Sequence, residues 1–231
     1  MVDVKSNLAN VKQRIKDAEQ KYGREPGAVE LIAVSKTKPV EMLSLAIETG
    51  QRHFGENYVQ EAIEKIALLN GKSLIWHFIG PIQSNKSKLI AESFDWVHSV
   101  DRIKIARRLS EQRPEGKAKL NICLQVNASD EKTKSGVEFD NLPRLVEQVL
   151  ELPNLNLAGL MAIPGREGPF DAQCEPFHRL KQSMLDLNHQ FGLEMKTLSM
   201  GMSGDLEAAI SAGATFVRVG TDIFGERDYS V

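Results

Sequence analysis

The chain has 231 residues, with 29 Lys and Arg against 31 Asp and Glu, which gives a formal net charge of −2. This balance lacks the basic excess that nucleic-acid binding usually needs, so nucleic acid is not an expected partner. A hydrophobic fraction of 42% and a charged fraction of 26% are those of an ordinary globular protein, which excludes a disordered chain.

Neither a signal peptide nor a membrane span is indicated. Residues 1–5 lack a basic region followed by an apolar stretch, and the longest nearly apolar run, residues 157–163, is far shorter than the roughly 20 residues of a transmembrane helix. Cys123 and Cys174 are the only cysteines, and two thiols in a chain of this length are typical of reduced, buried residues. We expect a cytoplasmic protein without membrane association.

Helical and strand-like segments alternate along the chain. Apolar residues recur every three or four positions from Val4 to Tyr22, which predicts an amphipathic helix that Gly23 and Pro26 end. The predicted strands are residues 29–36, 53–57, 75–80, 96–100, 120–127, 155–164, 197–203 and 216–220. The predicted helices between them are residues 39–50, 58–69, 84–93, 102–111, 142–152, 174–191 and 206–212.

Strict alternation of strand and helix implies a parallel sheet. Eight such units suit a closed (β/α)₈ TIM barrel, which commonly occupies about 200–250 residues as one domain, better than an open doubly wound sheet. We therefore expect residues 1–231 to form a single barrel domain with an extra N-terminal helix. No helix is predicted after the last strand, and the N-terminal helix is expected to fill that position in the outer ring.

The carboxyl ends of the strands are where a barrel of this type carries its chemistry. Lys36 follows an apolar strand, where burial would lower the pKa of its amine and leave a nucleophile able to form a Schiff base. Lys38 is an equal candidate on this reasoning, and a solvated lysine is the alternative. Lys134 lies in the charged loop 129–140, which is either a mobile lid or solvated surface.

Two glycine-bearing turns follow the last two strands, where such barrels frequently bind phosphate. One contains Ser203 and Gly204 before a helix, and the other is Gly220 and Thr221. Their backbone N–H groups and hydroxyls suit an anion, although glycine is also common in strand-to-helix turns for backbone reasons alone.

Arg218 alternates with two valines, so it points into the barrel mouth if the valines face the helices. A buried guanidinium needs an acceptor, which would be a protein carboxylate or the ring nitrogen or phosphate of a cofactor. The five histidines have no metal-ligand spacing, so no metal site is expected. His77 is either a pocket residue or a hydrogen-bonded core histidine.

Seven segments carry a resemblance to a known family. They are AVSKTKP (33–39), FGENY (54–58), HFIGPIQSNK (77–86), KSG (134–136), GLMAIP (159–164), LSMGMS (198–203) and RVGTDIFGER (218–227). In this order and spacing they resemble the pyridoxal phosphate homeostasis proteins, also called the YggS or PROSC family, and the match runs nearly end to end.

The resemblance implies a barrel of the alanine racemase amino-terminal type that carries pyridoxal 5′-phosphate (PLP) through a Schiff base on Lys36. It implies PLP phosphate binding by Ser203, Gly204, Gly220 and Thr221, Arg218 opposite the pyridine nitrogen, and Asn57 near the ring. The family often has an acidic residue after the serine where this chain has Gly204, so only the backbone N–H is expected to contribute there.

Three functions remain open at this stage. The first is a PLP carrier that buffers the cofactor or delivers it to apo-forms of PLP-dependent enzymes, because an arginine opposite the pyridine nitrogen weakens PLP as an electron sink. The second is a PLP-dependent amino-acid racemase of low activity. The related racemases take a second acid–base group from an additional β domain, which also dimerises them, so the carrier and a monomer are favoured here. The third is an aldolase-like barrel that uses Lys36 without a cofactor.

Overall fold

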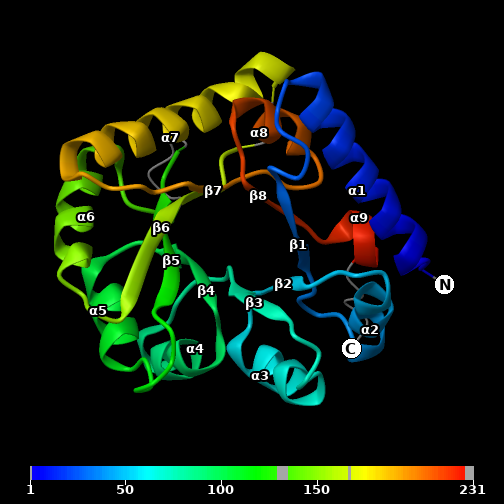
Figure 1. The fold of residues 1–231 in the computed structure, drawn as a ribbon, viewed down its shortest axis with the longest axis horizontal. Coiled ribbons are helices and arrows are strands. Elements are labelled where there is room, and N and C mark those ends of the chain that lie inside the picture. The colour runs from blue at the N-terminus through cyan, green and yellow to red at the C-terminus, as the bar shows by residue number, and fades with distance from the viewer. Residues whose placement is uncertain (1, 129–134, 166–167, 227–231) are drawn as a thin grey trace.

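The computed structural model of the protein describes residues 2–128, 135–165 and 168–226. Its centre is a closed barrel of parallel strands that follow one another in chain order, with β1 pairing with both β2 and β8 (Figure 1). The strands are β1 (Glu30–Val34), β2 (His53–Glu56), β3 (Ile75–Phe78), β4 (Trp96–Val100), β5 (Leu120–Val126), β6 (Leu155–Ala162), β7 (Thr197–Ser199) and β8 (Phe216–Val219). The predicted eight-stranded barrel is confirmed.

Helices surround the barrel (Figure 1). They are α1 (Val4–Lys21), α2 (Val40–Glu48), α3 (Val59–Leu68), α4 (Ser87–Ser93), α5 (Ile103–Glu111), α6 (Leu142–Leu150), α7 (Phe170–Phe191), α8 (Leu206–Ala212) and α9 (Thr221–Phe224), with 3₁₀ turns at Ser84–Lys86 and Phe139–Asn141. Helix α1 contacts α2, α8 and α9, so it occupies the position in the outer ring that the sequence assigned to it.

Most predicted boundaries agree with the structure within one or two residues, and three differences are larger. Strand β7 ends at Ser199 and not at residue 203. A short helix, α9, follows the last strand where none was predicted, because Gly220 turns the chain directly into one helical turn. Helix α7 begins at Phe170 rather than at residue 174 and contains Pro176 in its interior. Proline normally marks a first helical turn, which is why the sequence places the start of this helix too late.

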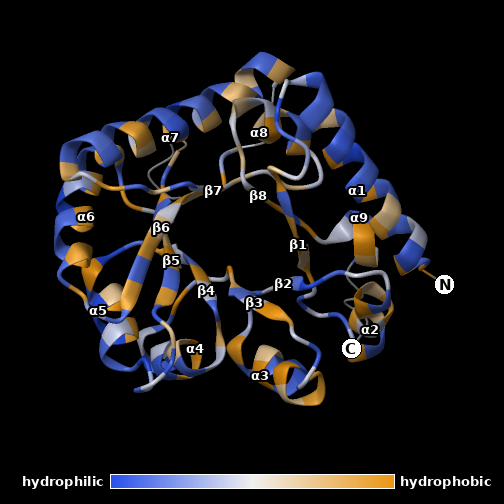
Figure 2. Ribbon diagram, viewed as in Figure 1, coloured by the Kyte–Doolittle hydropathy of each residue, from blue (hydrophilic) through white to orange (hydrophobic). Residues whose placement is uncertain are grey.

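The buried side chains form two layers. The larger layer lies between the barrel and the helices, and it includes the α1 stripe Val4, Leu8, Val11, Ile15 and Ala18. Figure 2 shows hydrophobic residues interspersed with hydrophilic ones along the outer helices, as expected for helices that bury one side. The second layer fills the barrel interior.

The interior is unusual because many of its side chains are polar. Ile32 and Met161 are buried but do not belong to the helix-facing core. Strands β3, β4 and β8 contribute His77, His98 and Arg218 to the interior, all nearly or fully buried. Barrel interiors are dominated by branched apolar residues, so these polar side chains require hydrogen-bond partners inside the protein.

None of the helices in the described parts of the chain has the length and apolar character to cross a membrane. Within the same described ranges, no group of three or more His, Cys, Asp or Glu residues is arranged to hold a metal ion.

Candidate functional site

A cavity of about 470 Å³ lies at the carboxyl ends of the strands. It is lined by Val34, Lys36, Asn57, Ile79, Ile163, Met202, Ser203, Gly204, Arg218, Gly220, Thr221 and Asp222. All seven residues predicted from the sequence as cofactor contacts are therefore brought together, although they come from four separate strand ends and span most of the chain.

The cavity distinguishes between the candidate lysines. Lys36 lines it, whereas the amine of Lys38 donates a hydrogen bond to the carbonyl of Glu226 at 2.6 Å and Lys38 is not among the lining residues. Lys134 lies outside the described residues. Of the two candidates that the structure describes, Lys36 is thus the amine that the fold presents to the cavity.

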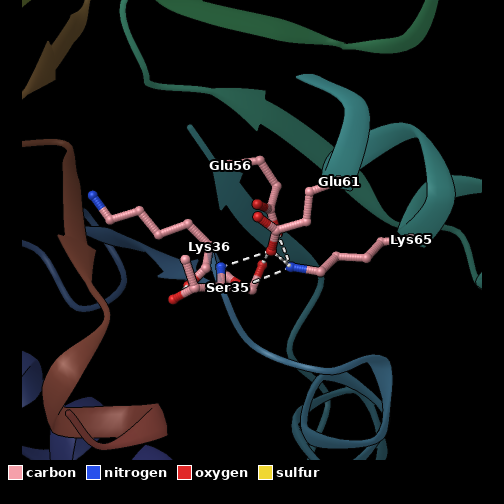
Figure 3. A network of polar contacts seen from close by, with 6 residues as sticks. Ser35, Lys36, Glu56, Glu61 and Lys65 are labelled. Carbon is pink, nitrogen blue, oxygen red and sulfur yellow. Dashed lines mark hydrogen bonds and ion pairs between the residues drawn. The ribbon is translucent and has the colours of Figure 1, made fainter. Parts of the chain in front are cut away.

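A buried polar cluster holds the backbone before Lys36 (Figure 3). The Ser35 hydroxyl donates to Glu56 Oε1 at 2.7 Å, and the Lys65 amine donates to the same oxygen at 2.8 Å and to the Ser35 carbonyl at 2.7 Å. Figure 3 shows the Lys36 side chain extending away from this cluster. The cluster therefore holds the backbone next to Lys36, while the Lys36 amine points away from the cluster.

The same cluster holds the residue after Lys36. Thr37 has a φ of +62°, which is unusual for a residue with a side chain, and its N–H donates to Glu61 Oε1 at 2.6 Å. Lys65 donates to that carboxylate oxygen at 2.5 Å, so one amine joins both supports. Helix α3 supplies Glu61 and Lys65, which lie one turn apart.

Burial raises the pKa of the Glu56 carboxyl above its ordinary value, although Lys65 and the Ser35 hydroxyl oppose the shift. The second oxygen of Glu56, Oε2, is buried and has no hydrogen-bond partner among the described residues, which explains why desolvation is the larger effect.

Arg218 enters the cavity from the barrel interior. Its neighbours Val217 and Val219 belong to the helix-facing core, as the alternation predicted. Its NH1 donates to Ser199 Oγ at 2.8 Å and its NH2 to the Ala162 carbonyl at 3.0 Å. These two acceptors are neutral, so both contacts are hydrogen bonds and not ion pairs.

The two glycine turns lie side by side at the cavity, and α1 ties them together. Arg14 donates from NH2 to the Ser203 carbonyl at 2.9 Å and from NH1 to the Asp222 carboxylate at 2.6 Å. At Gly220, a Cβ would come within 3.1 Å of the Val34 carbonyl, so any other residue would push this turn away from β1. The turn thus depends on glycine for its close approach.

Asn57 lies where the cavity meets a second one of about 500 Å³, which also touches Ile79 and Ile163. Its side-chain oxygen is buried and has no hydrogen-bond partner among the described residues, which suits a polar group of a ligand. Gly80 packs directly against the Asn57 backbone, and a Cβ there would overlap it. A glycine at position 80 therefore fixes Asn57 at the cavity wall.

The remaining candidates are structural. His77 is fully buried and hydrogen-bonded to two other histidines, as the core interpretation predicted. Cys123 and Cys174 are buried and free, and burial raises the pKa of the Cys123 thiol to about 12, which keeps it protonated and unreactive.

Sequence reasoning missed the residues that support the site. Arg14, Glu61 and Lys65 form hydrogen bonds with Ser203, Thr37 and Ser35 but lie outside all seven motif segments. Glu56 lies in the segment FGENY (54–58), but the sequence indicated no role for it. A partial signal exists for Glu61 and Lys65, because an acidic and a basic residue four positions apart indicate a helix surface pair. Nothing in the sequence indicates that this pair faces Lys36.

Comparison with known proteins places the fold first. The family described as "Alanine racemase, N-terminal domain" matches residues 6–228. The alanine racemase of Corynebacterium glutamicum superimposes with a TM-score of 0.71 at 16% identity over 98% of this chain and 62% of the racemase, which shows a common barrel.

Relatives of higher identity define the particular family. The pyridoxal phosphate homeostasis protein of Pseudomonas aeruginosa is 57% identical over 99% of this chain and 98% of its own length. That of Escherichia coli K12 is 50% identical over 100% and 99%. PipY of Synechococcus elongatus, solved with PLP bound, is 36% identical over 96% of this chain and all of its own, with a TM-score of 0.85. The chain belongs to the pyridoxal phosphate homeostasis protein family, as its motifs implied.

Proposed function

We propose that this protein binds PLP in the cavity, holds it covalently through Lys36, and serves PLP homeostasis by buffering the cofactor or delivering it to apo-forms of PLP-dependent enzymes. The observation that carries the proposal is the meeting of one amine, one buried guanidinium and two glycine turns in a single cavity. The PLP bound to PipY supports the choice of ligand.

The residues of the cavity fit the groups of this cofactor. Ser203, Gly204, Gly220 and Thr221 would hold the phosphate with hydroxyls and backbone N–H groups. Arg218 would face the pyridine nitrogen, and Asn57 would offer its unsatisfied side-chain oxygen to a donor on the polar edge of the ring. When bound, PLP supplies an aldehyde that condenses with a primary amine with loss of one water.

The lining residues favour storage over turnover. Arg218 donates hydrogen bonds and does not give up its proton at neutral pH, so it keeps an acceptor nitrogen opposite it unprotonated. Among the described residues of the cavity wall, the ionisable ones are Lys36, Arg218 and Asp222, and Asp222 is paired with Arg14 at 2.6 Å. This wall therefore offers Lys36 as its proton acceptor for acid–base work, and we expect no efficient catalysis.

A weak racemase activity is the second candidate, and the adjacent cavity favours it. Asp101 and Arg102 line that cavity and pair with each other at 2.6 Å, and such opposite charges suit the ammonium and carboxylate of an amino acid. Deuterium exchange at the α-carbon of a panel of amino acids, faster than free PLP achieves, would establish this activity and contradict a carrier-only function.

The test is a PLP titration followed by visible absorbance, with borohydride reduction and peptide mapping of the product. The label is expected on Lys36, and Lys36→Ala is expected to lose the absorbance band. Lys38→Ala is the matched control, because its amine contacts Glu226 outside the cavity, and it should bind PLP like the parent. A colourless parent that cannot be loaded, or a label on Lys38, would contradict the proposal.

A further inference from the structure

Three histidines form a continuous hydrogen-bond chain through the barrel interior. His53 Nδ1 lies 2.9 Å from His77 Nε2, and His77 Nδ1 lies 2.9 Å from His98 Nε2. His98 Nδ1 then lies 2.8 Å from Ser199 Oγ, the same oxygen that accepts from Arg218. The chain therefore leads from the amino-terminal end of β2 to the guanidinium at the cavity.

Aromatic side chains enclose this path. Trp96 and Phe216, the first residues of β4 and β8, lie with their ring centres 5.3 Å apart, and each is within 6 Å of both His77 and His98. Such apolar walls keep water from competing for the imidazole nitrogens, so each ring must find its hydrogen-bond partners within the chain.

The donor-to-acceptor direction of this hydrogen-bond chain follows from the groups at its two ends. Arg218 has only N–H donors, so Ser199 Oγ accepts from it, and the Ser199 hydroxyl hydrogen is then available to His98 Nδ1. If Nδ1 accepts, His98 carries its proton on Nε2 and donates to His77 Nδ1. His77 in turn donates from Nε2 to His53 Nδ1.

The far end agrees with this direction. His53 would then carry its proton on Nε2, and that atom lies 4.0 Å from the Glu30 carboxylate. The reverse direction would point an imidazole N–H toward the Arg218 side and a nitrogen lone pair toward Glu30, both unfavourable electrostatically. It would also leave the Ser199 hydroxyl hydrogen without an acceptor in the chain.

We propose that Ser199, His98, His77 and His53 are positioning residues for Arg218: they form one directional chain, with every imidazole neutral and protonated on Nε2, that holds the guanidinium toward the cavity. The fully buried rings of His77 and His98, the partly buried ring of His53 and the single direction serve one purpose. They offer a strong neutral acceptor to Arg218, fixed at both ends by charges of opposite sign.

The protonation pattern can be tested without any ligand. In protein labelled with ¹⁵N at histidine, long-range ¹⁵N–¹H spectra at pH 7 should show His53, His77 and His98 as neutral rings with the proton on Nε2. The exposed His178 and His189 are internal references, and His98→Asn and His77→Asn assign the signals. A charged ring, or an Nδ1–H form at His98 or His77, would overturn the proposal.

The positioning role is tested with two substitutions of similar size. The oxygen of His98→Asn can replace Nδ1 as the acceptor for Ser199, whereas His98→Leu cannot. We expect PLP affinity to fall about tenfold in His98→Leu, as for one lost buried hydrogen bond, and less than about threefold in His98→Asn. Ser199→Ala removes a single oxygen and should match His98→Leu, which guards against a variant that fails to fold.

His189→Gln, on the surface of α7, is the matched control and should bind PLP like the parent. Equal affinities in His98→Leu and His98→Asn would reduce the chain to a packing role and overturn the proposal. This affinity measurement rests on the proposed function, whereas the nitrogen spectra do not. A parent that binds no PLP but shows the expected tautomers would contradict the function alone.

Discussion

Lys36 and Arg218 are held at the same cavity by opposite kinds of support. Around Lys36 the charges belong to the support, because Glu61 and Lys65 bind the backbone on either side of it and Glu56 binds the Ser35 hydroxyl. Around Arg218 the charge belongs to the residue that is held, and a hydroxyl and a carbonyl are among its hydrogen-bond acceptors.

The difference follows from what the proposed function requires of each group. A lysine that reacts through its amine is best held by its backbone, since a carboxylate on the amine itself would keep it charged. A guanidinium that acts through its hydrogen bonds is best held by part of its own donor set. We therefore expect the charged cluster near Lys36 to lose stability when one of its charges is removed. The neutral hydrogen-bond partners of Arg218 should lose stability when a proton is added to them.

Removing the Lys65 amine should produce the largest loss of unfolding free energy. Lys65→Met leaves Glu56, which is fully buried, without its cation, and breaking such a buried pair costs about 3–5 kcal/mol of unfolding free energy. Chemical denaturation measures this loss. Adding Glu56→Gln should recover much of it, because the charge that remains without Lys65, on Glu61, is partly exposed to solvent.

Lys88→Met is the matched control for that experiment. Lys88 pairs with Glu92 four residues along α4, but both side chains are exposed, and such pairs contribute less than about 1 kcal/mol. A Lys65→Met variant no less stable than Lys88→Met would mean that the cluster near Lys36 is not an energetically important support.

The second largest effect is expected from acid, which should lower the unfolding free energy through the histidines that support Arg218. Burial lowers the pKa of His98 to about 3, below the ordinary value of about 6.5 that the unfolded chain retains. Between these two pKa values the unfolded state binds a proton that the folded state does not bind. The contribution of His98 to the unfolding free energy is therefore present above about pH 6.5 and is lost as the pH falls toward 3.

From His98 alone we expect about 2 kcal/mol less unfolding free energy at pH 5 than at pH 6.5. Burial lowers the pKa of His77 as well, which acts in the same direction. Urea denaturation at both pH values gives the slope, and His98→Asn, which cannot titrate, should reduce it. A slope unchanged by that substitution would contradict this origin.

The link between the two glycine turns should matter less, because its side chains are partly exposed. Arg14→Gln removes the bridge from α1 to Ser203 and Asp222, and we expect PLP affinity to fall about threefold with little change in stability. Lys16→Gln, exposed on the same helix, is the control. Equal affinities of the two variants in a PLP titration would show that Arg14 does not organise the turns.

The smallest effect is expected at Thr37. Thr37→Gly removes the strain of a positive φ but frees the unfolded chain, so the unfolding free energy should change by less than about 1 kcal/mol. Ser73, at a φ of +52° and outside the residues lining the cavity, gives the matched Ser73→Gly control. PLP affinity should fall only in Thr37→Gly, and a fall in both would argue against a role for the Thr37 backbone in orienting Lys36.

Much of the barrel could be predicted because its signals are local. Apolar runs of strand length alternate with helical stripes, and every predicted strand corresponds to one of the barrel. The prediction of helix positions was wrong where one residue type is common in two different local structures. Pro176 lies inside α7 instead of near its start, and Gly220 begins a helical turn instead of a terminal loop.

The cavity wall was also predictable, because residues at the carboxyl ends of parallel strands meet at one end of a barrel. The sequence by itself determined this wall, the alternation that turns Arg218 inward and the presence of a lysine after the first strand. Motif resemblance then selected Lys36 over Lys38, and the lining of the cavity agrees with that choice.

Only the tertiary structure decided which side chains support that wall. The period of two places His77, His98 and Ser199 on inward faces, but barrel closure and strand stagger determine which inward residues touch. Likewise, the packing of α3 and α1 brings Lys65 under Ser35 and Arg14 between two turns about 200 residues away. Local patterns fix the face of an element, whereas partners across the barrel depend on how all its elements close together.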